Sequence, residues 1–266
     1  MGEQMVNIVD SADGTPIAFD KSGTGDPLIL VSGALGARAG EAGLAGLLAS
    51  DFTVFTYDRR GRGDSGDAAQ YSAGCEIDDL AAIITAAGGS ACAYGSSSGA
   101  NLTLQAANRG LAITKLAAWE PNFLVDDSRP PLPADYVTHL RGLVSSDRRA
   151  DAVEYFMTRA VGLPAEFVAP MRSAPMWPGM ETVAHTLAYD GTIVGQSMSG
   201  KPLSGEWSAI GVPVLILDGG QTPWLTAGAD AIASVIPHAQ RHTLPGQPHN
   251  VAPEALAPAL RKFFAR

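Results

Sequence analysis

The sequence predicts an α/β protein with a doubly wound, mostly parallel sheet of eight strands and a helical lid inserted into it. Continuous apolar runs such as Leu28-Ile29-Leu30-Val31 have strand length, and such runs are typical of strands buried on both faces of a parallel sheet. They alternate with segments of helical pattern, which indicates strand-helix-strand units with right-handed crossovers. One long, proline-rich segment interrupts this alternation and predicts the lid.

The predicted elements begin with a hairpin whose strands cover 6–9 and 16–19, joined by the turn Asp10-Ser11-Ala12-Asp13-Gly14. Further strands are expected at 28–31, 53–57, 91–94, 116–119 and 212–217, with a last strand around His242. Helices are expected at 39–49, 75–87, 99–108 and 227–236. A C-terminal helix at 253–264 should pack on the sheet, because its apolar residues recur at helical spacing.

The lid is predicted where this rhythm stops, at residues 121–203. Prolines open the segment, in Arg129-Pro130-Pro131-Leu132-Pro133, and helical patterns cover 151–161 and 180–189. Residues 1–120 and 204–266 then form the sheet core. The prediction is one sheet domain interrupted by a lid, and not two domains in series.

Composition excludes several classes of protein. Of the 266 residues, 46% are hydrophobic and 17% charged, which is incompatible with a disordered chain. The net charge of −9, without a basic cluster, makes nucleic acid a poor partner.

The N-terminus resembles no signal peptide, and no run reaches the roughly 18 apolar residues of a membrane span, so we expect a cytoplasmic protein without a membrane partner. The two cysteines form no disulfide framework, and scattered histidines indicate no metal or cofactor. The oligomeric state stays open.

The chemistry is predicted by Gly95-Ser96-Ser97-Ser98-Gly99, which follows a strand and precedes a helix. That context is required of the G-x-S-x-G nucleophile elbow, in which the middle serine stands on a strained turn. Glycines on either side let strand and helix approach closely. The backbone N–H of Ser98 begins the helix and faces a developing oxyanion.

On this motif and its context, the chain resembles the serine-hydrolase branch of the α/β-hydrolase superfamily over nearly its whole length. The run from Tyr57 to Ser65 is similar to that family's D-x-R-G-x-G-x-S turn, where Asp58 and the arginines are expected to be structural. The segment Leu244-Pro245-Gly246-Gln247-Pro248-His249 resembles the family's L-P-G-x-x-H loop. The resemblance implies Ser97 as nucleophile and His249 as the base that a serine hydroxyl needs.

The acid of the triad departs from the commonest family pattern, because Thr222 stands where many members have aspartate. Glu120 and Asp218 are the two candidates. Glu120 is favoured, since one helix, one loop and one returning strand separate it from Ser97, so both should emerge at the carboxyl edge of neighbouring strands. Zearalenone-lactonase-like members also place a glutamate after this strand, in a segment comparable to Trp119-Glu120-Pro121. Asp218 remains the alternative acid.

The second oxyanion donor is expected from the loop after the strand at 28–31, with the backbone N–H of Ala34 preferred to that of Gly33. Ser32 occupies the place where many relatives have histidine, but a backbone donor does not depend on that side chain. Apolar residues of the lid are expected to form the substrate pocket: Phe123, Tyr136, Met176 and Trp177.

These residues predict a serine hydrolase that cleaves a hydrophobic, small-molecule carboxylic ester or lactone through an acyl-enzyme on Ser97. Three alternatives stay open. A carbon–carbon bond hydrolase or a cofactor-free perhydrolase would use the same triad, and a non-catalytic small-molecule binder would use the fold alone. Dehalogenase and epoxide hydrolase chemistry needs a nucleophilic aspartate, so Ser97 excludes both.

Overall fold

A computed structural model describes residues 6–265. Within them, eight strands form one sheet in the order β1-β2-β4-β3-β5-β6-β7-β8, with β1, β2 and β4 paired antiparallel and the remaining neighbours parallel. The predicted mostly parallel sheet is confirmed. The strands are β1 (Asn7–Asp10), β2 (Pro16–Gly23), β3 (Asp26–Val31), β4 (Phe52–Tyr57), β5 (Ala91–Ser96), β6 (Ile113–Trp119), β7 (Val214–Asp218) and β8 (Ala239–Thr243).

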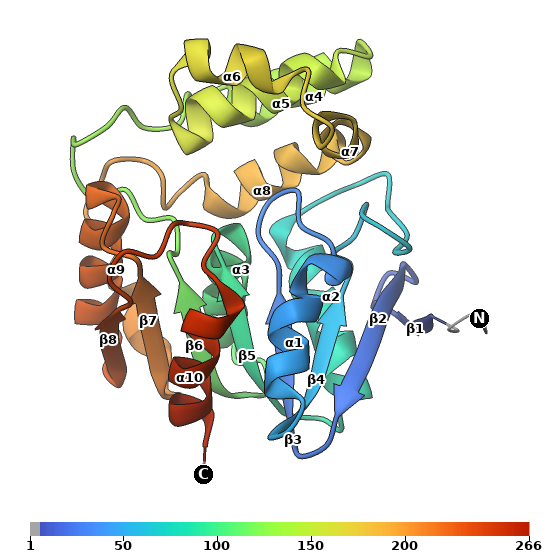
Figure 1. Cartoon of the computed structure of the whole chain (residues 1–266), viewed down its shortest axis with the longest axis vertical. Helices are drawn as coiled ribbons and strands as arrows, with labels where there is room; N and C mark the ends of the chain where they lie inside the picture. Colours follow the sequence, from blue (N-terminus) through green and yellow to red (C-terminus); the bar gives the residue numbers. More distant parts are fainter. Residues whose placement is uncertain (1–5, 266) are drawn as a thin grey trace.

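Helices cover both faces of this sheet (Figure 1). One face packs against α2 (Ala73–Ala86), α3 (Ser98–Asn108) and α9 (Pro223–Val235), and the other against α1 (Ala42–Leu48) and α10 (Pro253–Phe264). Both faces of the central strands are therefore buried, which explains why those strands are continuous apolar runs. No helix among residues 6–265 is both long and apolar enough to cross a membrane.

The helices between β6 and β7 form a separate layer beyond the carboxyl ends of the parallel strands (Figure 1). They have their own apolar core, centred on Leu140, Val153 and Leu187. The elements of the lid segment, residues 121–203, are α4 (Tyr136–Ser145), α5 (Arg149–Phe156), the π-helical turn η2 (Met157–Val161), α6 (Ala165–Met171), α7 (Trp177–Thr182), η3 (Ala184–Thr186) and α8 (Leu187–Val194). Of these, α8 lies nearest the sheet and contacts α3 (Figure 1).

Short 3-10 turns complete the connections, with η1 (Arg38–Glu41) before α1 and η4 (Gly205–Ala209) before β7. The helix predicted at 180–189 is wrong as one element, because the chain leaves α7 at Val183 and passes through η3 before α8 begins. Thr182 and Val183 are β-branched, and such residues lose side-chain freedom in a helix. Helices α4 and α6 were not expected from the sequence.

Candidate active site

Ser97 stands at the tight turn between β5 and α3, with φ 54° and ψ −125°. A positive φ is strained for a residue with a side chain, and such strain clusters at functional turns. The flanking glycines are required by close packing. A Cβ on Gly95 would lie 2.5 Å from the carbonyl oxygen of Gly99, and a Cβ on Gly99 would lie 2.5 Å from that of Ser32. Strand, strained serine and helix thus have the geometry of a nucleophile elbow.

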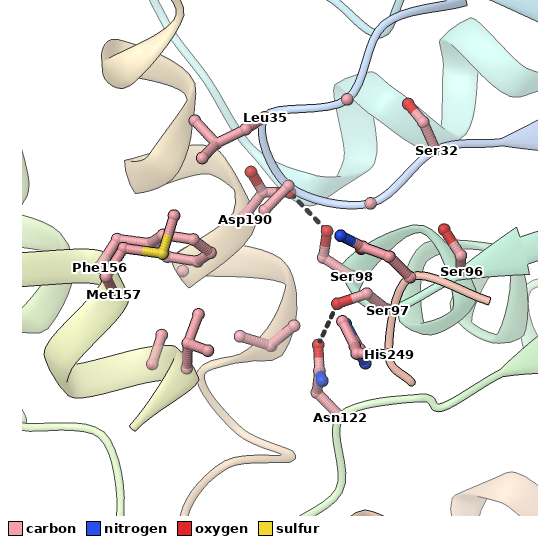
Figure 2. Close-up of a pocket in the computed structure, with 18 of the residues that line it drawn as sticks. Ser32, Leu35, Ser96, Ser97, Ser98, Asn122, Phe156, Met157, Asp190 and His249 are labelled. Atoms are coloured by element: carbon pink, nitrogen blue, oxygen red, sulfur yellow. Dashed lines mark hydrogen bonds between the residues drawn. The ribbon is translucent and has the colours of Figure 1, made fainter. Parts of the chain in front are cut away.

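His249 approaches this turn from the loop between β8 and α10. Its Nδ1 lies 2.6 Å from Oε2 of Glu120. Because a carboxylate accepts hydrogen bonds, Nδ1 is the nitrogen that donates here, and in the neutral imidazole this leaves Nε2 as the acceptor. Ser97 and His249 line the same cavity, and Figure 2 shows the imidazole beside the serine.

Glu120 directly follows β6 and is held by several bonds. Its backbone has φ 42°, and its N–H donates to the carbonyl oxygen of Leu217 at 2.8 Å. The side chain is 3% exposed, and Oε1 accepts the N–H of Gly219 at 3.0 Å. The indole of Trp119 donates to the carbonyl oxygen of His249 at 2.8 Å, which fixes the histidine loop against the same strand.

Asp218, the alternative acid, is engaged elsewhere. Its Oδ1 lies 2.9 Å from Nη1 of Arg241, and its Oδ2 accepts the hydroxyl of Thr226 at 2.5 Å. Burial opposes ionisation of Asp218, but these partners outweigh it and lower the pKa of this carboxyl from its ordinary value. The carboxylate that contacts His249 is Glu120.

The loop after β3 passes next to Ser97. A Cβ on Gly33 would lie 3.0 Å from Cβ of Ser97, and Ala34 lines the cavity together with Ser97 and Ser98. Ser98 is the first residue of α3, so its N–H has no acceptor within the helix. In the same loop Leu35 has φ 61°, a second strained residue beside the cavity. The two backbone donors expected from the sequence therefore border one site.

Asn122 belongs to this site and was missed by the sequence analysis. The hydroxyl of Ser97 donates to Oδ1 of Asn122 at 3.3 Å (Figure 2). The backbone of Asn122 is fixed by Asn101, which accepts its N–H at 2.7 Å and donates to its carbonyl oxygen at 3.1 Å. The only signal in the sequence was its place two residues after Glu120, in the segment that follows β6.

The cavity above Ser97 has a volume of about 710 Å³ and lies between the strand ends and the lid segment. Its walls are mainly apolar, and five methionines contribute to them. Their flexible, polarisable side chains fill irregular space and adapt to different ligands. These residues are Met157, Met171, Met176, Met180 and Met198.

Two of the four predicted pocket residues, Tyr136 and Met176, line this cavity. Phe123 and Trp177 do not, and their assignment is corrected. Phe123 packs edge-on against Trp207, with ring centroids 5.4 Å apart, in the core that also contains α2, α3 and α9. Trp177 is buried in the core of the lid segment. Both side chains gain more from burial among helices than from facing a solvent-filled cavity.

His249 is the one histidine of the five that lines the cavity. The ring of His139 lies tilted against that of Tyr155, with centroids 4.4 Å apart, and Nε2 of His185 lies 3.7 Å from Asp67. Burial lowers the pKa of His185. Over residues 6–265, no group of three or more His, Cys, Asp or Glu side chains is arranged to hold a metal ion.

The turn after β4 has the structural role expected of it. Asp58 is buried and accepts the backbone N–H groups of Arg38 and Asp64 at 2.8 and 3.0 Å. Ser65 donates its hydroxyl to the carbonyl oxygen of Asp58 at 2.6 Å. Gly63 has φ 52°, and a Cβ there would collide with the Asp58 carboxylate, so only glycine fits this turn.

Comparison with known proteins agrees with this geometry. The alpha/beta hydrolase family matches residues 28–259. The crystal structure of an alpha/beta hydrolase from Sphaerobacter thermophilus is 54% identical, with a TM-score of 0.91 over 97% of this chain and 100% of that one. No curated protein matches the chain.

More distant structures share the fold. A bromoperoxidase from Bacillus anthracis is 18% identical, with a TM-score of 0.74 over 98% of this chain and 100% of that one. A thermophilic esterase from Thermogutta terrifontis is 22% identical, with a TM-score of 0.68 over 97% of each chain. The chain belongs to the alpha/beta hydrolase family, which confirms the resemblance inferred from its motifs.

Proposed function

We propose that this protein is a serine hydrolase that cleaves a hydrophobic carboxylic ester or lactone through an acyl-enzyme on Ser97. The observation that carries the proposal is the strained serine at the elbow, which shares its cavity with a histidine bonded to Glu120 at 2.6 Å. Nucleophile, base and base-orienting acid come from three different strand ends, as a catalytic triad requires. The esterase among the structural neighbours is consistent with this class.

In the first half of the reaction, Oγ of Ser97 bonds to the carbonyl carbon, and its proton passes to Nε2 of His249. The carbonyl oxygen takes up the negative charge and is held by the N–H groups of Ala34 and Ser98. Glu120 stabilises the imidazolium. When the tetrahedral intermediate collapses, the bond to the leaving alkoxide breaks, and His249 returns the proton to that oxygen.

In the second half, water replaces the alcohol. His249 takes a proton from the water as its oxygen bonds to the acyl carbon, and the same two N–H groups hold the second oxyanion. Collapse breaks the bond to Oγ of Ser97, which recovers its proton from His249. For a lactone the leaving alcohol stays attached to the acyl group, and the product is one hydroxy acid.

The walls of the cavity support a neutral, apolar substrate. Its lining residues include no lysine or arginine, and the ionisable side chains among them are those of Glu41, Tyr136, Asp190 and His249. A substrate carboxylate would lose its hydration without gaining a cationic partner, which is unfavourable. The methionines and aromatic residues provide contacts for acyl chains or rings.

The test is covalent labelling by a fluorophosphonate together with hydrolysis of p-nitrophenyl esters. Wild-type protein should be labelled and should turn over the esters, and Ser97→Ala should lose both activities. Turnover at the wild-type rate in Ser97→Ala would refute the mechanism. A protein that binds hydrophobic ligands but neither reacts with the probe nor hydrolyses any ester or lactone would instead support a non-catalytic binder.

A further inference from the structure

We propose that Arg62 and Asp190 are positioning residues for the oxyanion hole. Arg62 fixes the Gly33–Ala34 peptide by bonding to its carbonyl oxygen. Asp190, on helix α8 of the lid segment, bonds to both Arg62 and Ser98. The inference rests on the proposed function, because it assigns a role in the same reaction. It concerns how the two backbone donors are held in place, and it makes the hole depend on a residue of the lid segment.

Arg62 bonds to the loop that carries the first donor. Its Nη1 donates to the carbonyl oxygens of Gly33 at 2.7 Å and of Gly36 at 3.3 Å, on either side of the strained Leu35. The carbonyl of Gly33 and the N–H of Ala34 belong to one planar trans peptide, so they point in opposite directions. A cation on that carbonyl therefore turns the N–H of Ala34 away from Arg62 and strengthens it as a donor.

Asp190 connects this guanidinium to the second donor. Its Oδ2 accepts from Nη2 of Arg62 at 2.8 Å. Its Oδ1 accepts the hydroxyl of Ser98 at 2.7 Å, a bond that Figure 2 shows. Ser98 supplies the other oxyanion N–H at the start of α3. Arg59 completes the set, donating to Oδ1 of Asp190 at 2.8 Å and to the carbonyl oxygen of Ser32 at 3.3 Å. The carboxylate of Asp190 thus links the two donor segments of the oxyanion hole, one through Arg62 and the other through the Ser98 side chain.

The cluster is buried and balanced in charge. Arg59, Arg62, Glu76 and Asp190 are each 3% exposed or less, and Arg59 makes a two-point pair with Glu76 at 2.6 and 2.9 Å. Burial alone would raise the pKa of Asp190, but Arg62 and Arg59 outweigh it and hold this pKa below its ordinary value. Buried ion pairs add little stability over apolar packing, so four such groups behind one loop favour a role in fixing its geometry.

The same turn contains a matched control. Arg60 is 1% exposed and forms a two-point pair with Asp79 at 2.6 and 2.7 Å, but its other bonds go to Asp13 and to the carbonyl oxygen of Cys75. Replacing Arg60 by methionine removes a buried guanidinium of equal size whose bonds go to Asp79, Asp13 and Cys75 and not to the oxyanion loop. Any general loss of stability should therefore appear in both variants, and a loss of donor alignment only in Arg62→Met.

The experiment compares Arg62→Met, Asp190→Asn and Ser98→Ala with Arg60→Met. For each we would measure kcat and KM on a neutral p-nitrophenyl ester, and inhibition by a matched pair of ketones. A trifluoromethyl ketone forms a tetrahedral adduct with an oxyanion, whereas the methyl ketone binds as an unreacted carbonyl. Ser98→Ala is the mildest change, since it removes one hydroxyl and keeps the backbone donor, so it tests the inference even where the buried substitutions fail to fold.

Arg62→Met and Asp190→Asn should lower kcat about 10- to 100-fold with KM little changed, less than the cost of deleting a whole donor. Trifluoromethyl ketone affinity should fall in proportion, while methyl ketone affinity is unchanged. Ser98→Ala should show the same pattern at about 3- to 10-fold, and Arg60→Met should keep kcat within about threefold of wild type.

Two results would overturn the inference. One is equal loss of kcat in Arg62→Met and Arg60→Met, and the other is unchanged trifluoromethyl ketone affinity in the folded Arg62, Asp190 and Ser98 variants. Wild-type protein that neither hydrolyses esters nor binds the trifluoromethyl ketone would instead refute the proposed function, and this inference with it.

Discussion

Oε2 of Glu120 lies 2.6 Å from Nδ1 of His249, although the two residues are 129 positions apart in the chain. Glu120 directly follows β6, the strand beside β5, which ends just before Ser97, and His249 reaches Glu120 from the loop after β8. The position that many family members fill with aspartate holds Thr222, which directly precedes α9 and lines the cavity. The acid of the proposed triad has thus been supplied by a different strand.

Removing the charge of Glu120 should therefore abolish most of the activity. Glu120→Gln can donate its amide N–H to Nδ1 and so favours the histidine tautomer that cannot act as base, with an expected fall in kcat of roughly 10³-fold. Asp218→Asn should change kcat by less than about threefold, because its partners are Arg241 and Thr226. Steady-state kcat values of the two variants on one ester decide between the two carboxylates. A larger fall in Asp218→Asn than in Glu120→Gln would make Asp218 the acid.

Packing at the elbow gives a second prediction. In Gly99→Ala the new Cβ would meet the carbonyl oxygens of Val31 and Ser32, each at 2.5 Å, and backbone atoms there cannot move aside. We expect a loss of about 1–3 kcal/mol in the free energy of unfolding, with lower kcat because Ser97 shifts. Gly46→Ala is the control, since it lies in α1 with no atom within 4 Å of the new Cβ, and it should stabilise by about 0.5–1 kcal/mol. Denaturant unfolding and kcat are measured for both variants. Equal changes in the free energy of unfolding and in kcat for Gly99→Ala and Gly46→Ala would contradict the prediction.

Glu41 predicts a pH dependence of stability. Its side chain lines the cavity and makes no hydrogen bond or ion pair with residues 6–265, and burial raises its pKa to about 7 from 4.5. Between these two values the folded protein holds this proton more tightly than the unfolded chain does. The contribution of Glu41 to stability therefore falls as pH rises through this window and is constant above it.

Glu41→Gln should consequently gain stability relative to wild type by roughly 1–3 kcal/mol more at pH 8 than at pH 4.5. Urea unfolding at the two pH values measures the difference, with Glu206→Gln, whose carboxyl is exposed, as the control. A difference between wild type and Glu41→Gln that is the same at both pH values would show that Glu41 is not held in a desolvated place.

The charge of the substrate gives another prediction. Because no lysine or arginine lines the cavity, an ester whose acyl chain ends in a carboxylate should react at least about tenfold more slowly, in kcat/KM, than its methyl-terminated analogue of equal length. The pair differs mainly in charge, so the ratio reports the electrostatics of the cavity. Equal rates, or preference for the acid, would contradict the proposed substrate class.

Local patterns were sufficient to predict much of the fold. The apolar runs located the strands, and Gly95 to Gly99 located the strained turn at Ser97, because the close packing of strand and helix requires glycines at fixed positions. The position of Glu120 could also be predicted from the sequence, since chain order and right-handed crossovers put it at the same sheet edge as Ser97.

Other features depend on contacts that no local pattern encodes. The bonds of Asp190 to Ser98 and Arg59 join residues 92 and 131 positions apart. Phe123 and Trp177 are large and apolar, as pocket residues usually are. Whether such a side chain faces a cavity or a core depends on how the helices of the lid segment pack.

The most direct test of the central claim is the mass of the protein during turnover. Wild-type protein quenched in acid while it hydrolyses a neutral p-nitrophenyl ester should carry one added acyl group, and peptide mapping should place it on Ser97. Ser97→Ala treated in the same way should carry none. An acyl group on another residue, or ester hydrolysis that persists in Ser97→Ala, would contradict the account.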